Sequence, residues 1–294
     1  MNHDEYALQI RKTFGEGDAV RDAGLKTPKD VVRLDDISYG KADAKWQKLD
    51  VYRPKRAKDK MLPVILSIHG GGWVYGDKEV YQHYCMSLAQ RGFAVVNFSY
   101  RLAPEYQYPA SFEDTSAVAS WIIRNAKKYG FDTKHIFGVG DSAGAHMLSL
   151  FAAALTNAKY AADFVLPKNF AFQAIALNCG IYQMEADTMG EMSRELMKVL
   201  MPKGGTKKEL KNISSWHFIT PEFPPCFIMT CPGDFLFAGP DILIPELKKN
   251  GVPFVYRVYG SKKNPLSHVF HCNMRMAEGT LCNDEECAFF KEFC

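Results

Sequence analysis

The feature that most constrains the fold of this chain is a regular alternation of two kinds of segment from about residue 62 onward. Short, nearly continuous apolar runs are typical of strands in a parallel sheet that is covered on both faces. The longer segments between them have the apolar spacing of helices. This alternation predicts βαβ units and an α/β fold with a mostly parallel sheet. The parallel strands are expected at residues 63–68, 93–98, 135–139, 172–177, 225–230 and 254–259.

Two segments indicate how helices would cover this sheet. In residues 114–128, Val118, Trp121 and Ile122 follow the i, i+3, i+4 spacing of one helical face. Residues 143–154 are apolar almost all round, which predicts a buried helix. Upstream, residues 31–38 and 46–52 alternate partially, and we expect them to form an antiparallel pair that opens the sheet.

Two irregular regions, residues 1–28 and 182–217, fall outside the alternation. The first predicts one amphipathic helix and a loop. The second has helical spacing, and an insertion at this point of an α/β sheet commonly lies over the C-terminal strand ends, where ligands bind. We therefore expect both to form a cap on a single domain of residues 1–294; the alternative is a helical decoration on the side. The second region carries Met184, Met189, Met192 and Met197.

Composition limits the location and the partners of the protein. The net charge of +3 is spread along the chain, which does not favour a nucleic-acid or membrane-surface protein. The N-terminus does not resemble a secretory signal, and no run of about 18 apolar residues could span a bilayer. We therefore expect a cytoplasmic protein whose eight cysteines are free thiols. Cys272, Cys282, Cys287 and Cys294 lack paired C-x-x-C spacing, so no metal is expected there.

The pentapeptide GDSAG at residues 140–144 satisfies the G-x-S-x-G pattern. It stands directly after an apolar run and directly before a helical segment, which is the strand–turn–helix setting that the pattern requires. Small residues two before and two after the serine avoid clashes in this tight turn. The context predicts Ser142 as a nucleophile; the alternative is a purely structural tight turn.

The sequence HGGGW at residues 69–73 follows the first expected parallel strand. Consecutive glycines let the backbone approach a ligand with its N–H groups exposed, so Gly71, Gly72 and the N–H of Ala143 are the expected oxyanion-hole donors. The alternative is a loop that cradles a phosphate. Because neither nucleotide-binding glycine pattern is complete, no nucleotide cofactor is expected. His69 is expected to anchor the loop through hydrogen bonds.

A serine nucleophile needs a general base. His268 lies in a loop after the last expected strand, where a base would be presented at the sheet's C-terminal edge. His217 precedes a strand, at the wrong end. His271 is the remaining alternative, and we expect it to begin the final helix.

The base in turn needs a carboxylate, which in this arrangement lies between the serine and the histidine in the sequence. Asp234 follows the expected strand 225–230 and is the predicted acid. Asp241 is its rival, but it lies at the start of a predicted helix, where an acidic residue helps to cap the helix end.

Together these motifs resemble the hormone-sensitive-lipase-like family of α/β-hydrolases, the bacterial family IV esterases, over roughly residues 60–275. The resemblance implies an α/β-hydrolase fold and hydrolysis of carboxylic esters, usually with short acyl chains, without a metal or cofactor. It implies a cap of N-terminal helices plus the insertion after the sixth strand, and it permits a homodimer through edge strands. The matching segments are HGGGW, YRLAPE at 100–105, YPASFED at 108–114, GDSAG, GDFL at 233–236 and SHVF at 267–270.

The chain departs from the family in a few places. Phe237 and Ala238 stand near the position where the family often has a second acidic residue, and the loop GSKKNPLSH before the base is longer and more basic than usual. We expect a serine ester hydrolase that acts through an acyl-enzyme on short-chain esters, including acetyl esters, as small-molecule substrates. The alternatives are an amidase, formamidase or exopeptidase with the same triad, and a non-catalytic receptor for a small ligand.

Overall fold

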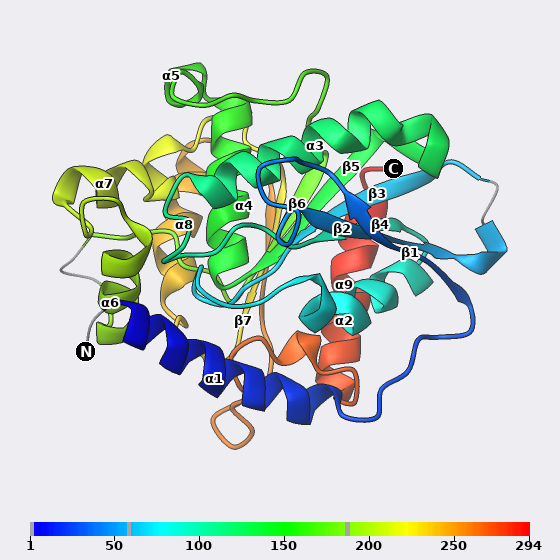
Figure 1. The fold of residues 1–294 in the computed structure, drawn as a ribbon, viewed down its shortest axis with the longest axis horizontal. Coiled ribbons are helices and arrows are strands. Elements are labelled where there is room, and N and C mark those ends of the chain that lie inside the picture. Colours follow the sequence, from blue (N-terminus) through cyan, green and yellow to red (C-terminus); the bar gives the residue numbers. More distant parts are fainter. Residues whose placement is uncertain (1–2, 58–59, 186–188) are drawn as a thin grey trace.

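The structure, a computed structural model, describes residues 3–57, 60–185 and 189–294. Its centre is an eight-stranded sheet in the order β1-β2-β4-β3-β5-β6-β7-β8 (Figure 1). Strands β3 to β8 run parallel, whereas β2 is antiparallel to both β1 and β4. This confirms the predicted α/β sheet and its antiparallel opening pair. The strands are β1 (Val31–Ser38), β2 (Lys48–Pro54), β3 (Leu62–Ile68), β4 (Ala94–Phe98), β5 (Phe131–Asp141), β6 (Ala174–Asn178), β7 (Cys226–Thr230) and β8 (Phe254–Val258).

Helices cover both faces of the sheet and its lower edge (Figure 1). The longer ones are α1 (His3–Asp22), α2 (Lys78–Gln90), α3 (Ala110–Tyr129), α4 (Ala143–Thr156), α6 (Glu191–Leu200), α8 (Gly239–Lys249) and α9 (Ala277–Lys291). The short ones are α5 (Ala158–Ala161), α7 (Lys207–Asn212) and the 3-10 helices η1 (Lys55–Ala57), η2 (Ser215–Phe218) and η3 (Phe270–Cys272). None of the helices in the described ranges is both long and apolar enough for a membrane span.

The period of two along β3 divides the core into two layers. Val64 and Leu66 belong to the larger cluster of buried residues, with side chains of α3, α4 and α8. Ile65 belongs to the second cluster, with side chains of α2 and α9. Because successive strand residues point to opposite faces, one continuous apolar run supplies both layers.

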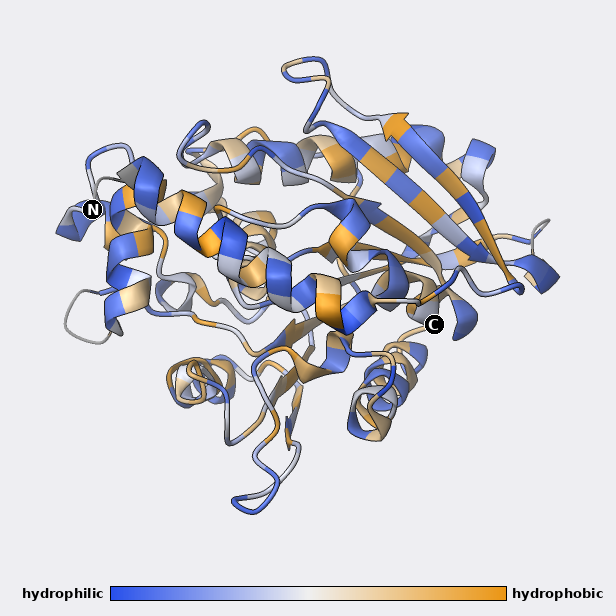
Figure 2. Ribbon diagram, turned by 60° about the horizontal axis from the view of Figure 1, so that its bottom comes forward, coloured by the Kyte–Doolittle hydropathy of each residue, from blue (hydrophilic) through white to orange (hydrophobic). Residues whose placement is uncertain are grey.

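Helix α1 lies across the edge of the sheet beside α6 (Figure 1). Ala7, Ile10 and Phe14 follow the i, i+3, i+7 spacing of one face and pack into the larger core. Figure 2 shows hydrophobic and hydrophilic residues alternating along this helix. Over the described residues, this agrees with the amphipathic helix expected at the N-terminus.

Three local expectations differ from the structure. Strand β5 begins at Phe131, four residues earlier than expected, because Phe131 and Asp132 pair with β3 ahead of a register shift. Helix α2 was not among the expected helices. The prediction that His271 begins the final helix is wrong: His271 lies in η3, and the extended backbone of Asn273 ends that turn before α9 starts.

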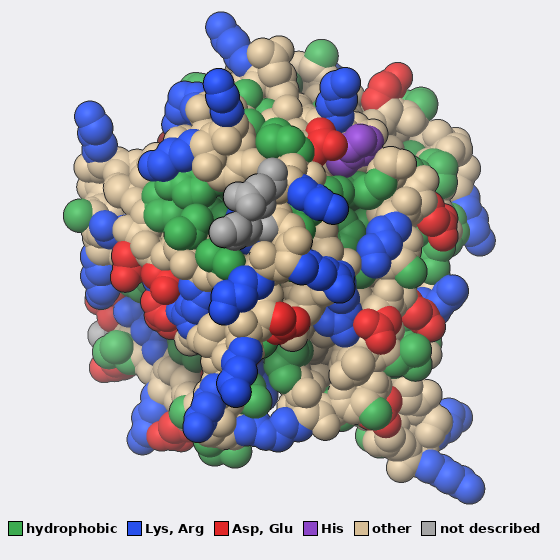
Figure 3. Space-filling view, turned by 90° about the vertical axis from the view of Figure 1, so that its right-hand side faces the viewer, with side chains coloured by type: hydrophobic (Ala, Val, Ile, Leu, Met, Phe, Trp, Pro, Cys, Tyr) green, Lys and Arg blue, Asp and Glu red, His purple; other side chains and the backbone are tan. Residues whose placement is uncertain are grey.

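Charged groups are distributed over the surface. Figure 3 shows Lys and Arg side chains over one face of the molecule, separated by apolar, polar and acidic side chains. This agrees with the charge pattern of the sequence. Within the described residues all eight cysteines are free thiols, as expected, and Cys294 alone is exposed.

Candidate active site

Ser142 occupies the sharp turn between β5 and α4. Its φ of 52° and ψ of −119° are unusual for a residue with a side chain. Such strain costs about 1–3 kcal/mol and persists only where the surroundings fix it. Here the Ser142 N–H donates to the carbonyl of Asn178 at 2.9 Å, and the Ser142 carbonyl accepts from the N–H of His146 at 3.0 Å. The turn is therefore held from β6 on one side and from α4 on the other.

The two glycines of GDSAG allow this turn to pack closely. A Cβ on Gly144 would lie 2.0 Å from the carbonyl oxygen of Ile68 in β3. A Cβ on Gly140 would lie 2.5 Å from the carbonyl oxygen of Gly144. These are backbone contacts that cannot move aside easily, so the spacing of the motif follows from steric contact with the neighbouring chain.

Asp234 and His268 form a hydrogen-bonded pair beside this turn, with 2.6 Å between His268 Nδ1 and Asp234 Oδ1. Asp234 also accepts bonds from the Leu236 N–H at 2.8 Å and the Thr230 hydroxyl at 2.9 Å. Burial opposes the charge of this carboxylate, but the hydrogen bonds outweigh burial and lower the pKa of Asp234. An ionised Asp234 can therefore hold a proton on His268 Nδ1 and leave Nε2 free.

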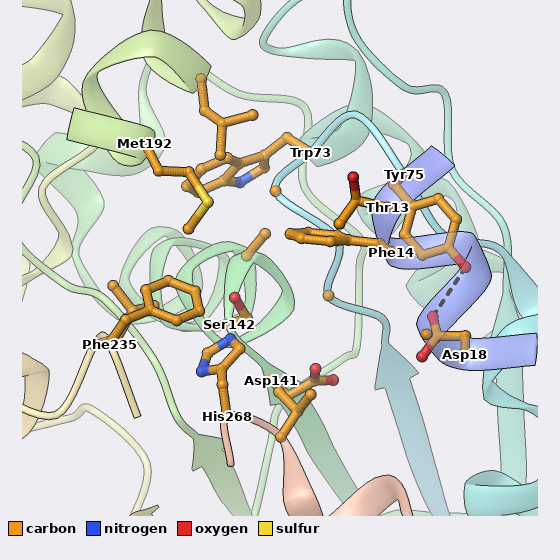
Figure 4. Close-up of a pocket in the computed structure, with 18 of the residues that line it drawn as sticks. Thr13, Phe14, Asp18, Trp73, Tyr75, Asp141, Ser142, Met192, Phe235 and His268 are labelled. Atoms are coloured by element: carbon orange, nitrogen blue, oxygen red, sulfur yellow. Dashed lines mark hydrogen bonds between the residues drawn. The ribbon is translucent and has the colours of Figure 1, made fainter. Parts of the chain in front are cut away.

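Ser142 and His268 line the same cavity, and Figure 4 shows the serine hydroxyl beside the imidazole ring. Within the described part of the chain, the Ser142 hydroxyl has no hydrogen-bond partner. Catalytic hydrogen bonds are often long before a substrate is bound and tighten afterwards. Ser142, Asp234 and His268 thus come together although they follow the C-terminal ends of three different parallel strands, β5, β7 and β8.

The glycine-rich loop lines the cavity next to Ser142. Gly71 has a φ of 116°, and a Cβ there would lie 2.1 Å from the carbonyl oxygen of Tyr75. As far as the described residues go, the N–H groups of Gly71 and Gly72 donate to no protein atom. Ala143 is the first residue of α4, where helices leave their N–H groups unpaired. These three groups are available to an oxygen atom in the cavity.

His69 stabilises this glycine-rich loop. Its Nδ1 lies 2.7 Å from the carbonyl oxygen of Gly70, and its ring stacks on Tyr100 with 4.0 Å between the ring centres. Burial lowers the pKa of His69 to about 4, so the ring is neutral at neutral pH. The predicted anchoring role agrees with these contacts.

The cavity has a volume of about 310 Å³, and residues from both irregular regions contribute to its lining. Helix α1 contributes Phe14, Asp18 and Arg21, which no sequence motif had indicated. Helix α6 contributes Met192 and Leu196. The other three methionines of the insertion, Met184, Met189 and Met197, are buried in the core instead.

The rival residues His271, His217 and Asp241 do not line this cavity. His271 is fully buried, and burial lowers its pKa to about 3. His217 pairs with Glu185 at 2.5 Å inside the insertion. Asp241 lies in the first turn of α8, as expected.

Among the residues that the structure describes, two groups of side chains bring metal-ligating atoms within 4.8 Å of one another. The first consists of Cys179, Asp234 and His268, so a metal ion there would compete with the His268–Asp234 hydrogen bond. The second consists of Asp141, His271 and Cys272. In it Asp141 already accepts a bond from the Tyr81 hydroxyl at 2.7 Å.

Comparison with known proteins shows similarity to esterases. The family model described as BD-FAE matches residues 49–237. The esterase LipC of Mycobacterium tuberculosis is 30% identical over 159 residues, which are 54% of this chain and 39% of LipC. The ethyl acetate hydrolase of Pseudomonas putida is 30% identical over 148 residues, which are 50% of this chain and 46% of that protein. The matched segments span less than half the length of either relative.

Solved structures match nearly the whole chain. Esterase B of Lactobacillus rhamnosis has a TM-score of 0.88 at 25% identity, over 99% of this chain and 96% of that one. The same esterase inhibited by a C4-C4 tributyrin phosphonate has a TM-score of 0.89 at 26% identity, over 100% and 96%. These matches confirm the predicted α/β-hydrolase fold and the resemblance to hormone-sensitive-lipase-like esterases.

Proposed function

We propose that this chain, which belongs to the BD-FAE family, is a serine carboxylic ester hydrolase whose catalytic triad is Ser142, His268 and Asp234. The observation that carries the proposal is the meeting of two independent features in one cavity. One is a serine on a strained strand-to-helix turn. The other is a histidine held by a buried carboxylate at 2.6 Å. This combination is the arrangement that activates a serine hydroxyl.

In the proposed reaction, His268 Nε2 takes the proton of Ser142 as its Oγ attacks the ester carbonyl. Asp234 keeps the other nitrogen protonated and stabilises the imidazolium that forms. His268 then gives the proton to the leaving alcohol, and a water molecule hydrolyses the acyl-enzyme by the reverse use of the same groups.

The oxyanion of each tetrahedral intermediate would lie against the N–H groups of Gly71, Gly72 and Ala143. These donors are fixed before the reaction by the turn at residue 142 and by the tight backbone of the loop. Preorganised donors of this kind stabilise developing charge without reorganisation, and each typically contributes about a hundred- to a thousand-fold in turnover.

We further propose a preference for short acyl chains, acetyl esters included, within a single domain. The cavity is small and partly apolar, and its walls come from α1 and from α6 in the insertion, which together act as a cap. Two similar proteins point the same way: one is an ethyl acetate hydrolase and the other is inhibited by a tributyrin phosphonate.

A panel of p-nitrophenyl esters from acetate to decanoate tests this proposal, with the matched p-nitroanilides in parallel. We expect kcat/KM to be highest among the shorter esters and far lower for the anilides, and a burst of nitrophenol where deacylation is slow. Faster cleavage of the anilides would favour the amidase alternative. No cleavage of any ester would contradict the proposal and leave the receptor alternative.

A further inference from the structure

We propose that the end of the catalytic cavity beneath α1 is a polar subsite that binds hydroxyl groups of the substrate. The substrates would then be esters that carry hydroxyl groups close to the scissile bond. This inference rests on the proposed ester hydrolase function and adds the chemical class of the ester. Asp18 of α1 and Asp141, which precedes the nucleophile, are its central residues.

The cavity has two chemically different ends, with Ser142 between them (Figure 4). On one side of the serine, Met192 and Phe235 form an apolar wall that suits a hydrocarbon chain. On the other side lie the carboxyl groups of Asp141 and Asp18 (Figure 4). A purely hydrocarbon ester would supply no donor to the carboxylate oxygens of this second end, and a buried acceptor without a donor is costly.

The polar end is assembled from separate parts of the chain. Asp18 Oδ2 accepts a bond from the Tyr75 hydroxyl at 2.9 Å. Asp141 Oδ2 accepts one from the Tyr81 hydroxyl at 2.7 Å, and the Tyr81 oxygen accepts the N–H of Gly70 at 3.0 Å. All five residues line the cavity. The subsite is therefore continuous with the loop that would hold the oxyanion.

The groups that this end offers are acceptors. Asp141 Oδ1 has no hydrogen-bond partner in the described ranges, although Asp141 is only 2% exposed. Burial raises the pKa of Asp141 to about 6, as expected of a carboxyl with too few donors. A hydroxyl group in the cavity would supply a donor.

Arg21 lies at this end but is already engaged. Its guanidinium donates to Asp18 at 2.7 Å, to both carboxylate oxygens of Asp22 at 2.8 and 2.6 Å, and to the carbonyl of Val80 at 2.9 Å. It therefore has little capacity left for an anionic substrate, and its single charge is shared between Asp18 and Asp22. These contacts disfavour a carboxylate, and a hydroxyl is an uncharged group that can donate to the acceptor oxygens of this end.

The hydroxyl groups could belong to the alcohol or to the acyl part of the ester, and paired substrates distinguish these sources. For the alcohol, 1-butyrylglycerol is compared with propyl butyrate, which has the same carbon skeleton without the two hydroxyls. For the acyl part, ethyl 3-hydroxybutyrate is compared with ethyl butyrate. Sites built to bind a hydroxyl discriminate strongly against analogues that lack it. We expect kcat/KM to favour the hydroxylated member of at least one pair by about tenfold or more.

Asp18→Ala should bring that ratio to within about twofold of one, because it removes an acceptor without touching the proposed triad. Tyr75→Phe is a second variant, for the case that Asp18→Ala displaces α1. It removes one hydroxyl at the subsite but keeps the ion pair between Asp18 and Arg21. Glu16→Asn is the matched control, because Glu16 is exposed on the same helix and does not line the cavity. It should leave all four rates unchanged.

Equal rates for both members of both pairs would overturn the subsite while leaving the ester hydrolase proposal intact. Hydrolysis of none of these esters, nor of the aryl esters above, would overturn both. A ratio that is unchanged in folded Asp18→Ala and Tyr75→Phe would overturn the role of these residues. Butyrylcholine cleaved faster than 1-butyrylglycerol would also overturn it, because the subsite would then be a cation site.

Discussion

The C-terminal ends of the strands and the α1 helix that covers them hold their cavity residues by different means. Ser142 is fixed by backbone hydrogen bonds to two elements and by glycine contacts that leave no room for a methyl group. Helix α1 is instead attached through side chains. Ala7 and Ile10 pack into the larger core, Arg11 donates to the carbonyls of Val74 and Ala103, and Arg275 donates to the carbonyl of Arg21.

This difference separates two kinds of function. Groups that need fixed geometry lie where the backbone itself is constrained, which suits chemistry that loses rate with small misplacements. The walls that meet the rest of the substrate come from elements held by side chains, and these can change without moving the nucleophile. Substitutions at the sheet edge should therefore abolish turnover or folding, whereas substitutions in the cap should alter selectivity.

The largest effect is expected from Ser142→Ala. Removing the nucleophile of other serine hydrolases lowers turnover by about a million-fold, because the remaining groups of a triad do little alone. Steady-state hydrolysis of p-nitrophenyl butyrate, with circular dichroism to verify folding, measures this loss. A folded variant that retains a tenth of the activity would show that another residue is the nucleophile.

Asp234→Asn should come next, with turnover lower by about ten-thousand-fold, because an amide in this place favours the wrong tautomer of His268. Asp241→Asn is the control for the rival acid, since Asp241 lies in the first turn of α8 and does not line the catalytic cavity. The ratio of the two rates with the same ester gives the effect. Equal rates would place the functional carboxylate elsewhere.

A pair of glycine substitutions compares the stability of the two regions. Gly144→Ala should lower the free energy of unfolding by about 3 kcal/mol, because the new methyl group would overlap the Ile68 carbonyl. Gly17→Ala, inside α1, meets nothing within 4 Å and should raise it by about 0.5–1 kcal/mol. Urea unfolding of both variants measures these free energies, and equal changes in the two variants would contradict the proposed difference in packing.

The last effect concerns the pH dependence of stability and a contact between α4 and the insertion. His146 Nε2 lies 2.7 Å from the carbonyl oxygen of Ile213 and so links α4 to the insertion. Burial lowers the pKa of His146 to about 4, below the 6.5 of an unfolded histidine. Between pH 6.5 and 4 this histidine binds a proton in the unfolded chain but not in the folded chain. Its contribution to stability therefore falls as the pH falls.

In His146→Gln the dependence of unfolding free energy on pH should be flatter in this window, by on the order of 1 kcal/mol per pH unit. His135→Gln provides the control, because His135 is half-buried at the surface and pairs with Asp132. The buried carboxyl of Glu286, with a pKa raised to about 7, contributes with the opposite sign in both variants. The difference between the variants therefore isolates His146, and identical slopes would contradict the assignment.

The sequence predicted the sheet edge far better than the cap. Ser142, Gly71 and Gly72 belong to motifs in which neighbouring residues determine the backbone, so local sequence carries the information. Asp234 and His268 follow strands whose apolar runs are clear, and parallel strands bring such residues to one edge. The strand bounds accordingly differ from expectation by a few residues at most.

The cap could be located but its contacts could not. Phe14 and Asp18 lie more than a hundred residues before Ser142, and no spacing rule relates side chains across that distance. Helix α2 was missed although Tyr81, Tyr84 and Cys85 form a buried i, i+3, i+4 stripe behind the N-cap Asp77, a signal that was present. His271 was misplaced because a buried one-turn helix resembles the start of a long one in sequence.

Covalent labelling with a butyl phosphonate ester that carries a p-nitrophenyl leaving group tests whether Ser142 is the nucleophile. We predict one phosphonyl group per chain, located by mass spectrometry on the peptide that contains Ser142, with ester hydrolysis lost in proportion. A label on another residue, or full hydrolysis in a chain whose Ser142 is modified, would contradict it.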